Sequence, residues 1–303
     1  MPVVTDEQPE KDYTIIYDSA YTEQLNAKVR DQYGPKHDRS GVHATDLLYC
    51  LRKAWGKRRV PSADQPELDD ETILTWSGGL MFEDLISEGK RQKMAAYCFT
   101  CRTVSRVVPP VRGGTEPTHC SLCGNWWLLF TPDYIADDMI HEVKQTRKSR
   151  RRGPEDAQWW MDQLRTYTLF ANKAGWTGQY IARVVVNWIM GDYGRKKKGL
   201  RPLPPKSALD AYLVVFKKGF EAAWESELLR RMTIVLNEGM PVLTGMGEEF
   251  GADGISPAYE WECPTCPVGK ALGCERWLWG DDDRVIGTVG EEVDDSDEDS
   301  TSK

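Results

Sequence analysis

Three segments of the chain show hydrophobic patterns that predict regular elements. Residues 153–175, "GPEDAQWWMDQLRTYTLFANKAG", place apolar side chains at helical spacing and predict an amphipathic helix. The stretch "ETILTWSGGLMFEDLISEGKRQKM" at 71–94 predicts a second helix, which begins near Thr75–Gly79. The apolar run "QYIARVVVNWIM" at 179–190 predicts a buried strand.

A β-hairpin is expected between the two helices. The stretch "LLFTPDYIADDMIHEVKQT" at 128–146 begins with an apolar strand over 128–135 and turns at Asp137–Asp138. A second strand then follows over 139–144. Helix, hairpin, helix and later strand together predict a mixed α/β core.

Composition and charge narrow the class of protein. The 303 residues are 40% hydrophobic and 28% charged, with no apolar run long enough for a membrane span and no secretory signal at the N-terminus. A cytoplasmic protein is therefore expected. The net charge of −8 comes from residues 281–303, which hold ten acidic and two basic residues, so the rest carries 37 of each. Such a tail is expected to be disordered.

The hairpin carries the first candidate chemistry. Asp133 lies on its first strand, and Glu142 and Lys144 lie two apart on its second, so these two side chains share a face. Two acids and a lysine suit a phosphodiesterase that uses Mg²⁺ or Mn²⁺, because both ions prefer oxygen ligands. The backbone carbonyl of Val143 is a further candidate ligand. The competing interpretation is a salt bridge on an exposed hairpin.

The helices on either side add three candidates. Glu83 falls in the first turns of the upstream helix and is able to supply another carboxylate. Gln163 and Tyr167 are four residues apart on the downstream helix, so they lie on one face. The adjacent basic run "KQTRKSRRR" provides candidate phosphate contacts at Arg147, Lys148, Arg150, Arg151 and Arg152.

The eight cysteines divide into two sets of four. Cys98, Cys101, Cys120 and Cys123 form two CxxC pairs at the spacing of a zinc ribbon, with Gly124 suited to a tight turn.

Cys50, Cys263, Cys266 and Cys274 form the other set, more than two hundred residues apart at its ends. Four thiolates suit either zinc or a four-iron cluster, and the spacing does not decide between them.

The ordered motifs resemble the PD-(D/E)XK nuclease superfamily, in its RecB-like branch. The resemblance is carried by Pro132–Asp133, by Glu142-Val-Lys144 and by the QxxxY motif from Gln163 to Tyr167. "HATDLLYCLRKAW" and the C-terminal cysteine triple make it similar to the iron–sulfur members, which include the CRISPR-associated adaptation nucleases and the nuclease of the AddB subunit.

This resemblance implies a restriction-endonuclease-like core and Mg²⁺- or Mn²⁺-dependent cleavage of DNA that is single-stranded or has free ends, as by an exonuclease. It implies a catalytic site at Glu83, Asp133, Glu142 and Lys144, with Gln163 and Tyr167 as helpers. It also implies one [4Fe–4S] cluster of structural role on Cys50, Cys263, Cys266 and Cys274. The family usually has a histidine where Glu83 stands.

The predicted organisation is an N-terminal extension at 1–40, a nuclease domain at 41–280 and the acidic tail at 281–303. Within the domain, 96–126 is a zinc-ribbon insertion and 200–280 is a cluster-binding segment. The ribbon or the tail is a candidate contact for a protein partner.

Two other interpretations remain open. One is a DNA-binding or assembly protein with a degenerate nuclease fold. The other has two zinc sites and no iron.

Overall fold

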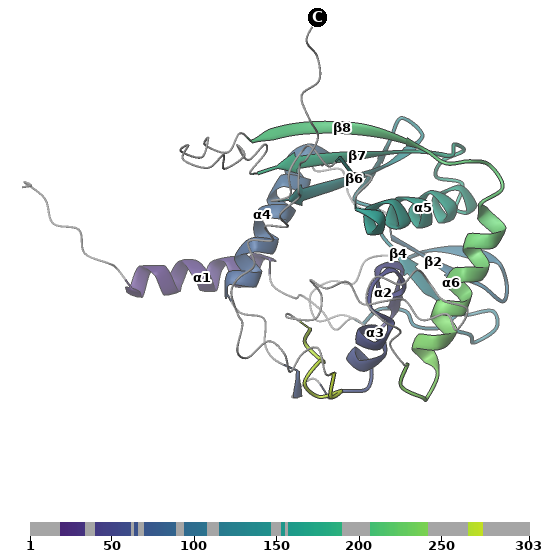
Figure 1. The fold of residues 1–303 in the computed structure, drawn as a ribbon, viewed down its shortest axis with the longest axis horizontal. Coiled ribbons are helices and arrows are strands. Elements are labelled where there is room, and N and C mark those ends of the chain that lie inside the picture. The colour runs from purple at the N-terminus through teal and green to yellow at the C-terminus, as the bar shows by residue number, and fades with distance from the viewer. Residues whose placement is uncertain are drawn as a thin grey trace, which may run out of the picture.

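The computed structural model describes residues 19–33, 40–61, 64–65, 70–88, 94–107, 115–146, 153–154, 157–189, 207–241 and 266–274. Its helices are α1 Ser19–Tyr33, α2 Ala44–Leu48, α3 Leu51–Lys57, α4 Asp70–Ser87, α5 Gln158–Lys173 and α6 Glu221–Leu236. Its strands are β1 Val42–His43, β2 Met94–Cys98, β3 Thr103–Val107, β4 Leu128–Phe130, β5 Tyr134–Ala136, β6 Met139–Thr146, β7 Ile181–Trp188 and β8 Ala208–Val215. Figure 1 shows a mixed α/β arrangement, which confirms the predicted class.

Within the described residues, the strands form two sheets of four, in the orders β1-β4-β2-β3 and β5-β6-β7-β8. In the first sheet β2 pairs antiparallel with both β3 and β4, and β1 pairs parallel with β4. In the second sheet β6 and β7 are parallel, whereas β5 and β8 are antiparallel to their neighbours. Helix α5 joins the two parallel strands, as such a connection requires.

Helix α5 lies between the two sheets and completes the core. Its Leu164 and Phe170 are fully buried in the main apolar cluster. The Phe170 ring lies 4.8 Å from the ring of Tyr97 on β2 and 5.4 Å from that of Phe130 on β4. On its other side α5 contacts β6 and β7. The sequence 153–175 therefore forms the expected helix, starting at Gln158, because its apolar face is buried between two sheets.

The first strand of the predicted hairpin is not continuous. Residues 128–130 form β4 in one sheet, while 134–136 form β5 in the other. Pro132 lies at the break, and its ring nitrogen has no hydrogen to donate to a ladder. The prediction that Asp133 lies on a strand is therefore wrong, because Asp133 lies in the crossover directly before β5.

The hairpin turn and second strand are confirmed. Asp137 and Asp138 have φ angles of 51° and 56°, the left-handed conformation that a two-residue hairpin turn requires. Tyr134 then pairs with His141 across the hairpin. Strand β6 continues to Thr146, two residues beyond the predicted end, because it is paired along its whole length with β7.

Helix α4 begins at Asp70, before the predicted start near Thr75–Gly79. It contacts both β6 and α1, so part of the predicted extension 1–40 packs on this helix. The predicted tail 281–303 lies outside the described residues. No described helix combines the length and apolarity needed to cross a membrane.

Candidate functional site

Asp133 and Glu142 lie close together where the crossover enters the second sheet. The Oδ2 atom of Asp133 accepts a hydrogen bond of 2.6 Å from the backbone N–H of Val143. Glu142 precedes Val143 on β6 and is 1% exposed. Val143 thus contributes its amide to a hydrogen bond with Asp133, and its carbonyl is the predicted further ligand. Because the strand breaks at Pro132, Asp133 lies in the crossover between the two sheets, where its carboxylate contacts β6.

Lys144 connects this acid pair to helix α5. Its Nζ atom donates to Glu142 Oε1 at 2.5 Å and to Gln163 Oε1 at 2.9 Å. Gln163 in turn donates from Nε2 to the Tyr167 hydroxyl at 3.2 Å. The strand period of two and the helical spacing of four therefore bring four predicted site residues into one hydrogen-bonded row.

Burial dominates the electrostatics of this row. It raises the pKa of Glu142 to about 8, and the negative charge of Asp133 adds to the rise. Burial also raises the pKa of Asp133, against the opposing charge of Lys144. For Lys144, burial alone would lower the pKa, but the charges of Glu142 and Asp133 raise it above its ordinary value. When both carboxyls are ionised they face one ammonium, which leaves one negative charge in excess at the site.

The second oxygen of Glu142 indicates what would balance that charge. Glu142 Oε2 is buried and accepts no hydrogen bond from the described residues. A buried carboxylate oxygen without a partner is costly, and a cation would satisfy it. Mg²⁺ is commonly held by one or two carboxylates, with water and substrate phosphate as its other ligands. Asp133 and Glu142 therefore fit a divalent ion.

Glu83 approaches this site from α4. Its charge is one of the causes that raise the pKa of Glu142, so the helix does bring it toward the hairpin. Among the described residues, however, only one group of three or more potential metal ligands has its ligand atoms within 4.8 Å of one another, and that group consists of four cysteines. The carboxylates of Glu83, Asp133 and Glu142 thus do not form one metal-sized group.

Tyr49 is a neighbour of the site that the sequence patterns did not reveal. Its charge is among the causes that raise the pKa values of Lys144 and Tyr167. It lies between α2 and α3, directly before Cys50. The one feature of the sequence that pointed to Tyr49 was its position directly before Cys50, a candidate metal ligand.

The four ribbon cysteines form a second site. The thiol sulfurs of Cys98, Cys101, Cys120 and Cys123 all lie within 4.8 Å of one another. The backbone N–H of Cys101 donates to Cys98 Sγ at 3.4 Å, and Gly124 has a φ of 72° in the predicted tight turn. Four converging thiols fit a tetrahedral metal ion, as the spacing predicts.

Local contacts favour a thiolate at this site. A hydrogen bond from the backbone of Asn125 and contacts with the other thiols lower the pKa of Cys123 to about 7. The neighbouring Cys101 shows the opposite, because its hydrogen bond to Cys123 raises its pKa to about 12. His119 lies outside the group and its Nδ1 atom contacts Thr118 Oγ1 at 2.7 Å.

The outer cysteines are described in part, because Cys263 lies outside the described residues. Cys50 is the N-cap of α3, and the segment 266–274 lies beside this helix in Figure 1. Arg52 on α3 lies 3.8 Å from Cys274 Sγ, measured from Nη1. Burial raises the pKa of Cys266, and the nearby Cys274 contributes to the rise. The segment that holds Cys50 and the segment 266–274 therefore meet at α3, as a shared site would require.

The predicted phosphate contacts lie outside the described residues, so their arrangement is not described. They are Arg147, Lys148, Arg150, Arg151 and Arg152.

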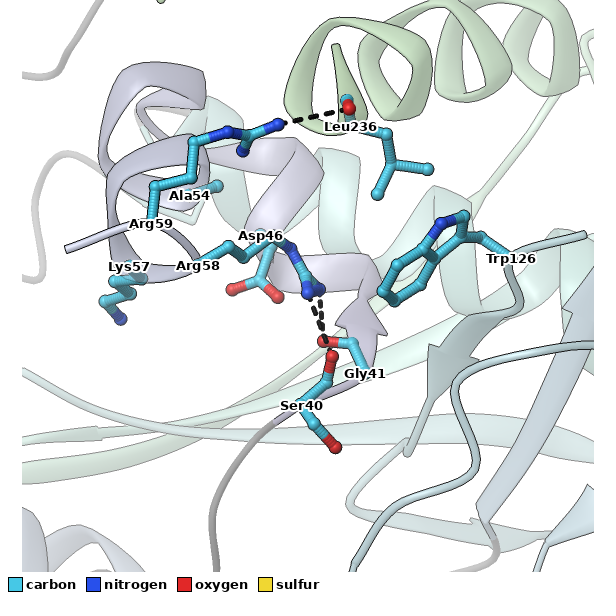
Figure 2. A pocket seen from close by; sticks show the side chains of 9 residues that line it. All are labelled: Ser40, Gly41, Asp46, Ala54, Lys57, Arg58, Arg59, Trp126 and Leu236. Carbon is cyan, nitrogen blue, oxygen red and sulfur yellow. Dashed lines mark hydrogen bonds between the residues drawn. The ribbon is translucent and has the colours of Figure 1, made fainter. Parts of the chain in front are cut away.

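A further pocket has a volume of about 440 Å³, and none of the predicted site residues that the structure describes lines it. Figure 2 shows it at the C-terminal end of α3. Arg58 donates there to the carbonyls of Ser40 and Gly41 and lies 5.3 Å from the Trp126 ring. Arg59 donates to the carbonyl of Leu236 at the end of α6. These contacts join α3 to the ribbon and to α6.

Comparisons with known proteins add little to this picture. No family model matches the chain, and no curated protein matches it. Among solved structures it is similar to the protein of the "Crystal structure of SSO0001", with 12% sequence identity and a TM-score of 0.44. That similarity covers 82% of this chain and 95% of the other. A TM-score this low does not establish a shared fold.

Proposed function

We propose that the chain is a Mg²⁺- or Mn²⁺-dependent deoxyribonuclease of the RecB-like PD-(D/E)XK type, which acts as an exonuclease. The observation that carries the proposal is the row Asp133–Glu142–Lys144–Gln163, in which Glu142 is buried and its Oε2 atom accepts no hydrogen bond from the described residues. Metal-dependent hydrolysis of a phosphodiester needs carboxylates that hold the ion and a positive group that stabilises the charge on the phosphate, and this row provides both.

Asp133 and Glu142 would hold the ion, with the Val143 carbonyl and Glu83 as further ligands. A divalent ion bound there supplies activation of water and neutralisation of charge on the phosphate. Lys144 donates a hydrogen bond to Glu142, and its ammonium would stabilise negative charge that develops on the phosphate. Gln163 fixes the direction of the Lys144 side chain, and Tyr167 fixes Gln163.

The two cysteine sites would have structural roles. We assign zinc to Cys98, Cys101, Cys120 and Cys123, and a [4Fe–4S] cluster to the outer set. DNA is the proposed partner.

Substitution of the central pair tests the nuclease proposal. Glu142→Ala and Lys144→Ala should each reduce Mn²⁺-dependent degradation of end-labelled DNA by about 100-fold or more, since each removes charge that acts at the reacting phosphate. Binding of the same DNA should persist. Asp84→Ala changes an exposed acid on the helix that carries Glu83 and is the matched control, with activity expected at the wild-type level.

The second candidate is a DNA-binding or assembly protein that does not hydrolyse DNA. It is favoured by the three carboxylates, which do not form one metal-sized group among the described residues. Wild-type protein that binds single- and double-stranded DNA but cleaves neither with Mn²⁺ would establish it and exclude the nuclease.

A further inference from the structure

The pocket at the C-terminal end of α3 has walls from parts of the chain that are far apart in sequence. Ser40 precedes β1, Asp46 lies on α2, Trp126 belongs to the ribbon and Leu236 ends α6. Its volume of about 440 Å³ falls in the range of small-molecule sites, which is roughly 300–1,000 Å³. The pocket is therefore large enough to hold a ligand of the size of a nucleotide.

Basic side chains outnumber acidic ones in this pocket. Lys57, Arg58 and Arg59 are consecutive in the chain, and Asp46 is the one acid among the nine described residues that line it. Three positive charges and one negative charge give the lining a net charge of +2. The Oδ2 atom of Asp46 also accepts a hydrogen bond of 2.9 Å from the backbone N–H of His43. This balance of charges favours an anionic ligand.

Printed contacts fix the directions of the two arginine side chains. Arg58 donates from Nη1 to the carbonyl of Ser40 at 2.9 Å and lies 5.3 Å from the ring centre of Trp126. Arg59 donates from Nη2 to the carbonyl of Leu236 at 3.1 Å. Figure 2 shows the two side chains directed to different walls. Because a carbonyl has no net charge, these hydrogen bonds hold the guanidinium groups without neutralising them, and little side-chain freedom would be lost when a ligand binds.

The remaining lining provides an exposed cation and an apolar wall. Lys57 is the last residue of α3 and is exposed, so its flexible side chain is accessible to a ligand from solvent. Ala54, Trp126 and Leu236 contribute apolar surface to the same pocket. A ligand with an anionic group and a less polar body would match both parts of this lining.

We propose that this pocket binds a phosphate group, which is carried by a DNA strand or by a free nucleotide. Phosphate oxygens match the planar donor fork of an arginine and the point charge of a lysine. With DNA as the source the inference rests on the proposed function, whereas with a free nucleotide it does not. The competing explanation is that the basic residues only stabilise the end of α3, because a helix C-terminus attracts cations.

Calorimetric titration with dTMP and with inorganic phosphate, at constant ionic strength, tests the pocket directly. Lys57→Gln removes one positive charge and should weaken binding of both by about twofold to fivefold, the range of an exposed ion pair. Asp46→Asn should tighten binding, because its amide oxygen still accepts from the His43 N–H while the opposing charge is gone. Lys217→Gln removes an exposed lysine that does not line the pocket and should bind like wild type. Helix stabilisation alone predicts no gain of affinity in Asp46→Asn.

The salt dependence of DNA binding separates the two sources of phosphate. In Glu142→Ala protein, added Lys57→Gln should reduce the salt slope for oligothymidine by about 0.7, the value of one single-strand phosphate contact, and added Lys217→Gln should not. An unchanged slope, with dTMP binding that responds to Lys57→Gln and Asp46→Asn, would assign the pocket to a free nucleotide.

The proposal is overturned if neither ligand distinguishes Lys57→Gln and Asp46→Asn from Lys217→Gln. Wild-type protein that cleaves no DNA would exclude the nuclease, while the dTMP titration would still decide the role of the pocket.

Discussion

At the scale of single residues, burial decides what each charged group does. Glu142 is buried beside another acid, and its Oε2 atom has no hydrogen-bond partner among the described residues, which suits it to a cation. Arg231 on α6 is also 1% exposed, but its charge is satisfied by Glu227 Oε1 at 2.7 Å and by the carbonyl of Leu47 at 3.0 Å. Glu142 is therefore suited to bind a cation, whereas Arg231 holds α6 against α2.

The Glu227–Arg231 pair makes stability depend on pH. Burial alone would raise the pKa of Glu227, but hydrogen bonds from Arg230 and Arg231 lower it below its ordinary value. A carboxyl with a lowered folded-state pKa stabilises the protein above its unfolded pKa, near 4.5, and that contribution is lost as pH falls through the folded value. Glu227→Gln should cost about 1.5–3 kcal/mol at pH 7, measured by urea unfolding.

The same variant should show a smaller loss of stability than wild type between pH 6 and about pH 3, since it has no carboxyl to protonate. Arg230→Ala, which removes the more exposed partner, serves as the control and should change stability little at pH 7. Parallel stability curves for wild type and Glu227→Gln would contradict the assignment.

Sequence periodicity was sufficient for part of the candidate site. Glu142 and Lys144 share a face because they are two apart on a strand, and Gln163 and Tyr167 because they are four apart on a helix. Tyr49 was missed because its relevance depends on the approach of elements that lie far apart in the chain. No local spacing carries that information.

At the scale of elements, α3 is the point where distant parts of the chain meet. Its Gly56 has no side chain, and an added Cβ would lie 2.5 Å from Leu272 Cδ1 and 3.0 Å from Val268 Cγ2. Trp55 on the same helix donates from Nε1 to the carbonyl of Asn237 at 2.9 Å. The close approach of the segment 266–274 to α3 therefore depends on glycine at this position.

Gly56→Ala should displace that segment, at a cost of about 1–3 kcal/mol for overpacking. Because the segment carries two of the proposed cluster ligands, iron content and visible absorbance of protein purified without oxygen should fall, while zinc content stays constant. Gly79→Ala is the matched control: its Cβ would meet no atom within 4 Å, and alanine should stabilise that helix by about 0.5–1 kcal/mol. Unchanged iron in Gly56→Ala would contradict the dependence of the cluster on this close approach, and wild-type protein without iron would exclude the outer cluster.

At the scale of the whole molecule, the ribbon is part of the core instead of an appended module. Strand β2 is buried along its whole length and ends at Cys98. Between β3 and β4, Glu116 Oε2 accepts a hydrogen bond from the backbone N–H of Gly41 at 3.2 Å. The same oxygen lies 2.8 Å from Nε2 of His43, next to α2. A metal on these cysteines would thus stabilise the sheet that supports α2 and α3.

Loss of the ribbon metal should therefore lower global stability. Cys120→Ser should release one equivalent of zinc and reduce the unfolding midpoint by about 5 °C or more, since structural zinc contributes several kcal/mol and each kcal/mol corresponds to about 2–4 °C at this size. His119→Ala should keep the zinc, because His119 is outside the cysteine group. Equal zinc loss in both variants would show that the histidine is a ligand. The measurements are metal analysis and thermal unfolding.

The sequence by itself determined the α/β class, the helix that covers the sheet, the hairpin turn and the grouping of the ribbon cysteines, because each follows from periodicity or spacing within a short stretch. Only the tertiary structure decided that the strand breaks at Pro132 between two sheets and that β2 is central to one of them. It also decided which oxygen of Glu142 has no hydrogen-bond partner in the part of the chain that the structure describes. These features depend on which surfaces bury one another, and burial is a property of the whole chain.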